Sequence, residues 1–180
     1  MILFGDEVSF AQWGSLGRTW ARVGQQPVVK TLGKRKGYKV FGLIDLLSGR
    51  FFYLGREERF NSDRYQVFLA QVLAETSQHI IVIQDGARYH TSKVTRDWFD
   101  AHRDRLIVFQ LPSYSPDYNP IEFLWKKMKQ RATHNKYFAE FKNMVEAVDE
   151  ALAHFAEQAV EIQAPIGLYV ETLKTTPVTA

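Results

Sequence analysis

The sequence contains no cysteine, which excludes disulfide bonds and thiolate metal sites and favours a cytoplasmic protein. Long apolar runs are also missing, since the longest, such as residues 80–83, are too short to cross a bilayer. The first ten residues lack the basic start and the apolar stretch of a signal peptide. With 46% hydrophobic residues, 180 residues are enough for one domain with a substantial core.

Negative charge is absent from one long segment. Residues 8–44 hold seven basic residues and no acidic one, although the formal net charge of the whole chain is only +3. Residues 121–139 hold five basic residues and one acid, whereas residues 140–180 hold seven acids and two lysines. Two basic segments favour a polyanion such as double-stranded DNA as partner, with ordinary solvated surface as the alternative. The candidate DNA contacts are Lys34, Arg35, Lys36, Lys126, Lys127, Lys129 and Arg131.

Hydrophobic periodicity predicts alternating strands and helices. In chain order, the predicted elements are strands at 1–7, 40–46 and 50–54, a helix from 61, a buried strand at 79–85, a helix at 91–102, a buried strand at 105–111 and two helices after 120. Three antiparallel strands followed by strands separated by helices predict an α/β fold, a mixed five-stranded sheet with helices on both faces. This order is similar to the ribonuclease H-like architecture. We expect a domain over residues 1–160 and a partly disordered tail over 161–180.

Two aspartates are predicted to meet at one edge of this sheet. Asp6 is placed at the end of the first strand and Asp85 at the end of the fourth. Because ligands gather at the carboxyl ends of strands in α/β sheets, adjacent strands would bring the two side chains together. With Glu122, they would form an oxygen-rich site suited to Mg²⁺ or Mn²⁺, most simply two ions.

Glu122 has two possible roles. In "SPDYNPIEF", Asn119, Pro120 and Glu122 occupy the positions of an N-cap, a first helical residue and a capping-box acid. Alternatively, the proline-bracketed loop fixes the start of the helix so that Glu122 points at a metal ion. We favour ligation, and we expect Asn119 to hold the loop and Trp125 to pack in the core.

Three stretches carry a family resemblance. "FGDEVSF" with "RTWARVGQQP", then "VIQDGARYHTS" and "LPSYSPDYNPIEFLWKKMKQ", resemble the DDE catalytic domain of mariner-superfamily transposases, in the bacterial branch named after insertion sequence 630. The resemblance implies that Asp6, Asp85 and Glu122 form the metal-binding triad, and that a bacterial protein associated with the nucleoid acts as a homodimer. The 36 residues between Asp85 and Glu122 agree with the family's usual separation. Gly86 stands where members usually have asparagine, and the family's helix-turn-helix domains do not precede the first strand.

Two further polar residues, His90 and Glu7, lie close to the aspartates in the sequence. His90 lies where the family's second motif usually has histidine, and we expect it to contact the site or the scissile phosphate; packing at a helix start is the alternative. Glu7 is expected outside the site of Asp6, because neighbouring residues of a strand point to opposite faces.

The resemblance implies a transposase that cleaves DNA and joins 3′-hydroxyls to target DNA. The alternatives are a ribonuclease H-like nuclease without strand transfer and an inactive relic that only binds DNA. In every case, sequence recognition is expected from a helix-turn-helix domain that is missing here or carried by another chain.

Overall fold

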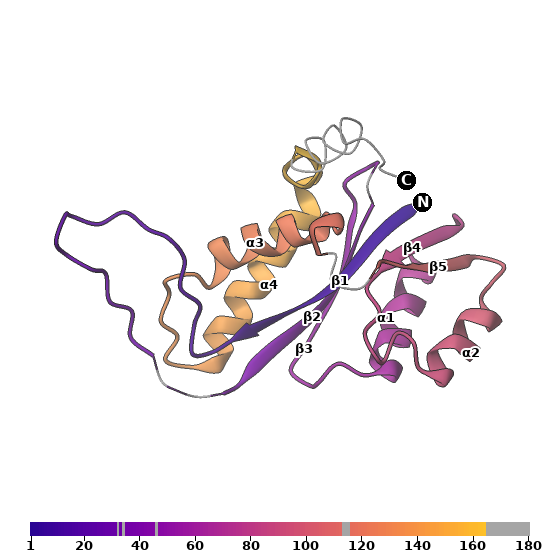
Figure 1. The fold of residues 1–180 in the computed structure, drawn as a ribbon, viewed down its shortest axis with the longest axis horizontal. Coiled ribbons are helices and arrows are strands. Elements are labelled where there is room, and N and C mark those ends of the chain that lie inside the picture. Colours follow the sequence, from indigo (N-terminus) through magenta and orange to yellow (C-terminus); the bar gives the residue numbers. More distant parts are fainter. Residues whose placement is uncertain (32, 34, 46, 113–115, 165–180) are drawn as a thin grey trace.

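The computed structural model describes residues 1–31, 33, 35–45, 47–112 and 116–164. Five strands form one mixed sheet in the order β3-β2-β1-β4-β5 (Figure 1). The strands are β1 (Ile2–Ala11), β2 (Gly37–Asp45), β3 (Phe51–Arg56), β4 (Ile80–Gln84) and β5 (Leu106–Gln110). β1 to β3 are antiparallel neighbours, while β4 and β5 run parallel to β1. The expected mixed five-stranded sheet is confirmed.

Helices cover both faces of the sheet, as predicted. The helices are α1 (Ser62–Ala74), α2 (Lys93–Ala101), α3 (Ile121–Ala132) and α4 (Phe141–Glu157), with a 3₁₀ turn, η1 (Pro116–Tyr118), before α3. α1 begins after Asn61, whose side chain accepts a hydrogen bond from the Arg64 backbone amide. The apolar positions that predicted this helix are all buried, namely Tyr65, Phe68, Leu69, Val72 and Leu73.

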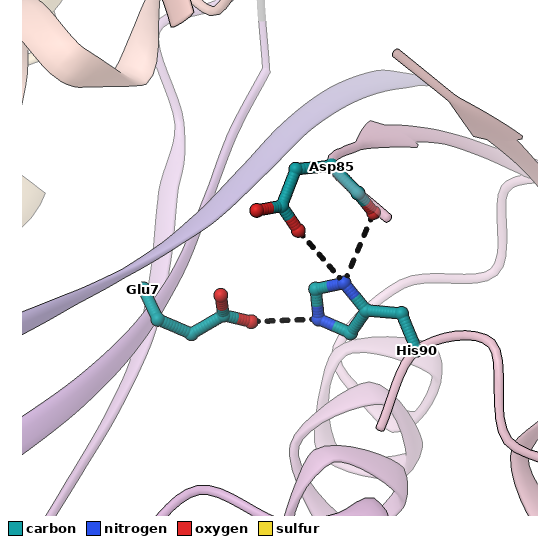
Figure 2. Close-up of side chains that lie close together, drawn as sticks. All are labelled: Glu7, Asp85 and His90. Atoms are coloured by element: carbon teal, nitrogen blue, oxygen red, sulfur yellow. Dashed lines mark hydrogen bonds and ion pairs between the residues drawn. The ribbon is translucent and has the colours of Figure 1, made fainter. Parts of the chain in front are cut away.

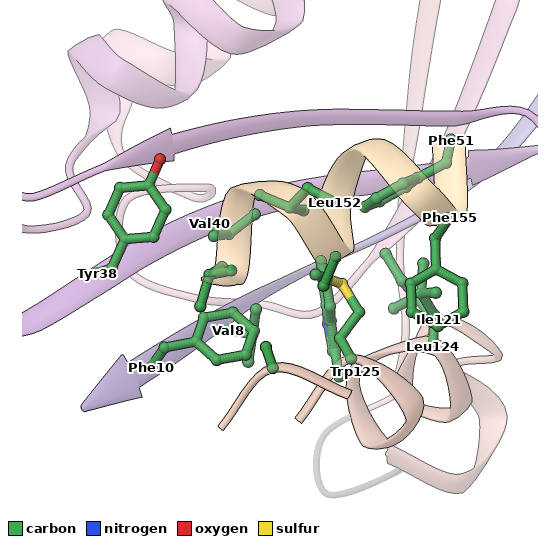
Figure 3. Close-up of a cluster of buried hydrophobic side chains, with 14 of the residues drawn as sticks. Val8, Phe10, Tyr38, Val40, Phe51, Ile121, Leu124, Trp125, Leu152 and Phe155 are labelled. Carbon is green, nitrogen blue, oxygen red and sulfur yellow. The ribbon is translucent and has the colours of Figure 1, made fainter. Parts of the chain in front are cut away.

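Alternation along β1 divides the core into two clusters. Phe4, Val8 and Phe10 face α3 and α4, where they pack with Trp125 and Met144 (Figure 3). Leu3 belongs to the other cluster, which packs under α1. Side chains at consecutive positions of β1 therefore enter different environments, and this separation decides how the polar residues of the strand are used.

Two strands differ from the sequence prediction. β1 runs to Ala11 instead of ending at residue 7, because it stays paired with β2 along its whole second half. β5 was expected to be buried, but Ile107 and Phe109 are 52% and 56% exposed. β5 is one of the two edge strands, and α3 and α4 pack on β1, β2 and β3 instead, so one face of β5 remains uncovered by them.

The described part of the chain continues a few residues past the expected boundary at residue 160. Residues 159–164 are helical, and Ile162 is buried in the cluster under α4. The rest of the expected tail, residues 165–180, lies outside the described residues. Within the part of the chain that is described, no helix is both long and apolar enough to cross a membrane.

Candidate active site

Asp6 lies in the middle of β1, not at its end as the sequence suggested. β1 and β4 pair in parallel, but the pairing joins only Ile2–Phe4 to Ile81–Ile83 and therefore ends before Asp6. β4 ends at Gln84, so continuing this register by two residues places Asp6 opposite Asp85. The two aspartates therefore occupy adjacent strand positions at the carboxyl end of β4, the kind of location where ligands bind in α/β sheets.

Trp125 of α3 holds the Asp6 side chain. Its Nε1 donates a hydrogen bond of 2.9 Å to Asp6 Oδ2, and its ring is 2% exposed. The register pairs Asp6 with Gly42 of β2, and a Cβ at Gly42 would lie only 2.4 Å from the Trp125 ring. The absence of a side chain at Gly42 thus leaves room for the indole to approach β2 and reach Asp6. Trp125 packs in the core, as expected, and also has this polar role.

The loop before α3 is fixed to β1 beside Asp6. The side-chain amide of Asn119 is buried and donates to the Gly5 backbone oxygen at 2.9 Å, which confirms its predicted role of holding the loop. Pro120 is the N-cap of α3, and no side chain caps the helix. The capping box that the sequence also allowed is therefore not formed. Glu122 lies in the first turn with an exposed side chain, and its carboxylate has no hydrogen bond or ion pair among the described residues.

His90 connects Asp85 with Glu7 (Figure 2). Its Nε2 lies 2.7 Å from Glu7 Oε1, and its Nδ1 lies 3.1 Å from both Asp85 Oδ1 and the Asp85 backbone oxygen. These oxygens are acceptors, so the geometry requires a proton on each ring nitrogen. The rings of Tyr65 and Tyr89 pack against the imidazole with centroid separations of 4.4 and 4.5 Å. His90 therefore packs against two aromatic rings, which fits the packing alternative. It also contacts Asp85, which fits the expected contact with the site.

The electrostatics of the site show that neighbouring carboxylates act on Asp6. The pKa of Asp6 is raised to about 7. Burial is the largest cause, and the charges of Glu7, Glu122 and Asp85 raise it further. A backbone hydrogen bond at Glu7 opposes this shift in part. Glu122 and Asp85 therefore lie within electrostatic range of Asp6, even though they come from α3 and from the end of β4.

His90 has the opposite effect on Asp85. Its hydrogen bond lowers the pKa of Asp85, so Asp85 stays ionised more readily than Asp6. Burial alone would lower the pKa of His90, but the hydrogen bonds to Asp85 and Glu7 outweigh burial and raise it to about 9. The imidazolium offsets part of the negative charge on its side of the sheet.

The donor set around Asp6 fits a hard divalent cation. Asp6, Asp85 and Glu122 offer only carboxylate oxygens, the ligands that Mg²⁺ and Mn²⁺ prefer. The raised pKa of Asp6 shows that negative charge is costly here, so a cation would relieve it. Among the described residues, the grouping whose potential ligand atoms all lie within 4.8 Å of one another is instead Glu7, Asp85 and His90, and Asp6 and Glu122 are not part of it. Both nitrogens of His90 face oxygen atoms within it, however, so this grouping is an ion-pair chain.

A second feature lies further along β1, and we refer to it as the basic cavity. It has a volume of about 1080 Å³ and is lined by Arg35, Lys36, Lys39, Arg59 and Lys129, with Glu57 as its one acid among the described lining residues. Trp13, Phe60 and Phe141 contribute apolar surface. The cavity shares no lining residue with the carboxylate cluster, although Ser9 and Phe10 of β1 reach it.

The structure separates the predicted DNA contacts into groups. Arg35, Lys36 and Lys129 line the basic cavity together, although two of them come from one sequence segment and one from another. Lys127 instead donates to the Glu161 backbone oxygen at 2.8 Å. Lys126 and Arg131 are exposed on α3 outside the cavity, and Lys34 lies outside the described residues.

Sequence reasoning missed Glu7, Lys39 and Arg59. The strand alternation predicted Glu7 on the face of β1 opposite to Asp6, although its charge still raises the pKa of Asp6. Nothing in the sequence showed that His90 lies on the face of Glu7. Lys39 belongs to the basic segment 8–44, so the sequence carried a signal for it as a DNA contact. Arg59 had no signal, because it reaches the cavity only through the fold.

Comparison with known proteins gives relatives that agree with this arrangement. The chain is 26% identical over 159 residues to the insertion element IS630 uncharacterized 39 kDa protein of Shigella sonnei, a match covering 87% of this chain and 44% of that protein. It is 29% identical over 176 residues to the Tc1 transposase of Caenorhabditis elegans, covering 84% and 61%. The Mos1 mariner paired-end complex with Mn superposes with a TM-score of 0.66 at 19% identity, covering 92% of this chain and 53% of that one.

The fold is ribonuclease H-like, and it is shared with the Mos1 transposase catalytic domain, which is 17% identical to this chain. Residues 1–145 match the DDE superfamily endonuclease family, and the chain belongs to that family. It spans about half the length of the relatives it matches. The expected family and fold are both confirmed.

Proposed function

We propose that this chain is the catalytic domain of a transposase, which cleaves DNA strands and joins the resulting 3′-hydroxyls to target DNA in cut-and-paste transposition. The observation that carries the proposal is the arrangement of three carboxylates: the register of β1 and β4, continued by two residues, sets Asp6 opposite Asp85, and the charge of Glu122 reaches Asp6 from α3. The Tc1 relative is a transposase, and Mos1 transposase has been solved with a transposon end and as a strand transfer complex.

Asp6, Asp85 and Glu122 would hold one or two divalent ions. Mos1 structures contain Mn or Mg, and the oxygen donors of this chain suit the same ions. When bound, two such ions activate an attacking water or hydroxyl and stabilise the leaving oxygen of a phosphodiester. The protein supplies the positions: Trp125 orients Asp6, and Asn119 fixes the loop from which Glu122 projects. Preorganised carboxylates lower the cost of assembling the site when DNA arrives.

The basic cavity would hold the sugar-phosphate backbone of the DNA. Five cations and one acid are among its described lining residues, and its distance from Asp6 follows from β1, on which Phe10 lies four positions after Asp6. At about 3.3 Å per residue this is roughly 13 Å. The cavity would therefore hold backbone a few nucleotides from the scissile phosphate, and it would do so without reading sequence.

Recognition of the element ends would come from elsewhere. We propose that a helix-turn-helix domain, on a separate chain or on a segment outside this sequence, reads the ends, and that two copies of the catalytic domain act together. The relatives are about twice as long as the region they share with this chain, which leaves room for such domains in them.

The test is a cleavage and joining assay with the whole chain. Labelled duplex DNA with pre-cleaved 3′-hydroxyl ends is incubated with Mg²⁺, with Mn²⁺ and with excess EDTA, and the products are separated on a denaturing gel. Joined products that require the metal ion support the proposal. Metal-dependent nicking without joining would instead favour the ribonuclease H-like nuclease, and full activity in EDTA would overturn both.

A further inference from the structure

Glu7 is a buried carboxylate that the proposed metal site does not use. Its side chain is 9% exposed, and it lies on the face of β1 opposite to Asp6. Buried carboxylates are rare unless they are paired, because their charge loses its hydration. Its partners are His90, at 2.7 Å, and Tyr89, which is also hydrogen-bonded to it.

The other end of this arrangement reaches one particular atom. His90 Nδ1 lies 3.1 Å from Asp85 Oδ1 (Figure 2). The Ala87 backbone amide also donates to this oxygen, at 3.1 Å. Asp85 Oδ2 has no hydrogen bond or ion pair among the described residues, and the Asp85 side chain is 57% exposed. One oxygen of Asp85 is thus held while the other is left for a ligand.

The imidazole itself is fixed from several sides. The rings of Tyr65 and Tyr89 pack against it, its side chain is 2% exposed, and the Asp85 backbone oxygen faces the same nitrogen as Asp85 Oδ1. Without Glu7, Nε2 of this buried ring would lose its acceptor, and a buried donor without a partner is costly. Glu7 therefore determines how the ring is oriented, and the ring determines where Asp85 Oδ1 is held.

We propose that Glu7 is a positioning residue, which acts through His90 to fix the Asp85 side chain with Oδ2 turned toward the metal ion. The inference rests on the proposed function, because it concerns the same metal site. Groups that orient metal ligands from behind typically change metal affinity about 10- to 100-fold when they are removed. The chain Glu7–His90–Asp85 is then a support for one ligand and not a metal site of its own.

Mn²⁺ binding to the whole chain without DNA tests this, with free Mn²⁺ measured by electron paramagnetic resonance. Glu7→Ala should weaken binding about 10- to 100-fold. Glu7→Gln should keep most of the affinity, because its amide oxygen can still accept from His90 Nε2. Glu58→Ala is the matched control: it removes an exposed glutamate with one ion pair, to Arg64, and should leave binding unchanged.

Two substitutions of His90 test the same chain from its centre. The amide nitrogen of asparagine is attached to Cγ, as Nδ1 is, whereas that of glutamine lies one carbon further out, as Nε2 does. His90→Asn can still donate to Asp85 and should bind Mn²⁺ more tightly than His90→Gln. Glu7→Ala combined with His90→Gln should be no weaker than the poorer single variant, because the two residues act in series.

The outcomes separate the possible roles of Glu7. Wild-type affinity in Glu7→Ala, with only a lower melting temperature, would make Glu7 a structural residue and overturn the inference. Equal losses in Glu7→Gln and Glu7→Ala, with fewer Mn²⁺ ions bound per chain, would make Glu7 a ligand and overturn it as well. A wild-type chain that binds no Mn²⁺ would overturn the proposed metal site, and this inference with it.

Discussion

The two ends of helix α3 carry opposite charges and serve different features. Glu122 lies in its first turn, beside the carboxylates of β1 and β4, while Lys129, in its last turn, lines the basic cavity. This distribution also complements the helix dipole, because an acid near the N-terminus and bases near the C-terminus both stabilise a helix. One helix thus connects the proposed catalytic centre with the proposed DNA grip.

The two ends differ in how their charges are used. At the first end, the carboxylates Asp6, Asp85 and Glu122 are few and come from different parts of the chain, and the other two raise the pKa of Asp6. We therefore expect each of them to matter singly. At the other end the cations are several and mostly exposed, and each neutralises one phosphate nearly independently. Replacements should therefore have all-or-none effects at the carboxylate end and graded effects at the basic end.

The largest expected effect is loss of DNA cleavage on replacing one carboxylate. Asp6→Ala, Asp85→Ala or Glu122→Ala should each lower the rate at least about 10³-fold, because the groups act as a unit. The circular dichroism spectrum should be unchanged. Asp63→Ala is the control for Glu122, since Asp63 also lies in the first turn of a helix, α1. A similar loss in Asp63→Ala would mean that helix stability, and not ligation, explains the effect.

At the basic end, a triple replacement should have a graded effect. Changing Arg35, Lys36 and Lys129 together to Ala should lower the slope of log affinity against log salt by up to about 2.7, or about 0.9 per phosphate contact. Binding should weaken equally for all DNA sequences. Fluorescence anisotropy over a salt series measures both quantities.

The control removes the same charge from another surface. Lys93, Arg96 and Arg103 lie on or just after α2, away from the basic cavity, and Lys93 and Arg103 pair with Asp97 and Asp100. Their joint replacement by Ala should leave the salt slope nearly unchanged. If both triple variants lose the same slope, DNA binding follows net charge and the cavity is not the grip.

The local parts of the fold could be predicted from the sequence. The amphipathic pattern of α1 identified all five of its buried core positions, because helical periodicity depends only on neighbouring residues. The end of β1 could not be predicted this way. The strand continues to Ala11 because β2 pairs with it, and the exposure of Ile107 depends on where α3 and α4 pack. Both are tertiary effects.

The candidate site likewise has parts that the sequence predicts and parts that depend on the tertiary fold. Motif spacing was enough to propose Asp6, Asp85 and Glu122, and a strand register then explains how two of them meet. The proposed support of Asp85 by Glu7 could not be predicted from the sequence. It depends on His90, which is distant in the chain, packing against the face of β1 that carries Glu7. The basic cavity was half predictable: the charged segments were evident, but Arg59 joins them only in the folded chain.

A smaller effect is expected on stability when Asp6 is neutralised. The pKa of Asp6 rises from 3.8 to about 7 on folding, so the ionised form is disfavoured in the folded state. The stability that the raised pKa of Asp6 contributes is fully present below about pH 4, and it is lost as the pH rises through 7. Asp6→Asn should therefore be more stable than wild type at pH 8 without metal, by about 1–3 kcal/mol. Urea unfolding measures this, and a difference that persists at pH 3.5 would contradict it.

The smallest expected effect concerns the indole that holds Asp6. Trp125→Phe keeps most of the buried ring but removes the Nε1 donor to Asp6, so the free energy of unfolding should fall by about 1 kcal/mol. Hydrogen bonds to charged groups are the stronger ones, so the loss should be larger at pH 8, where Asp6 is ionised, than at pH 5. The control is the same replacement made in the Asp6→Asn chain, which has no carboxylate for the indole to bind. There the loss should not vary between these pH values, and equal pH dependence with and without the Asp6 carboxylate would show that Trp125 does not act through Asp6.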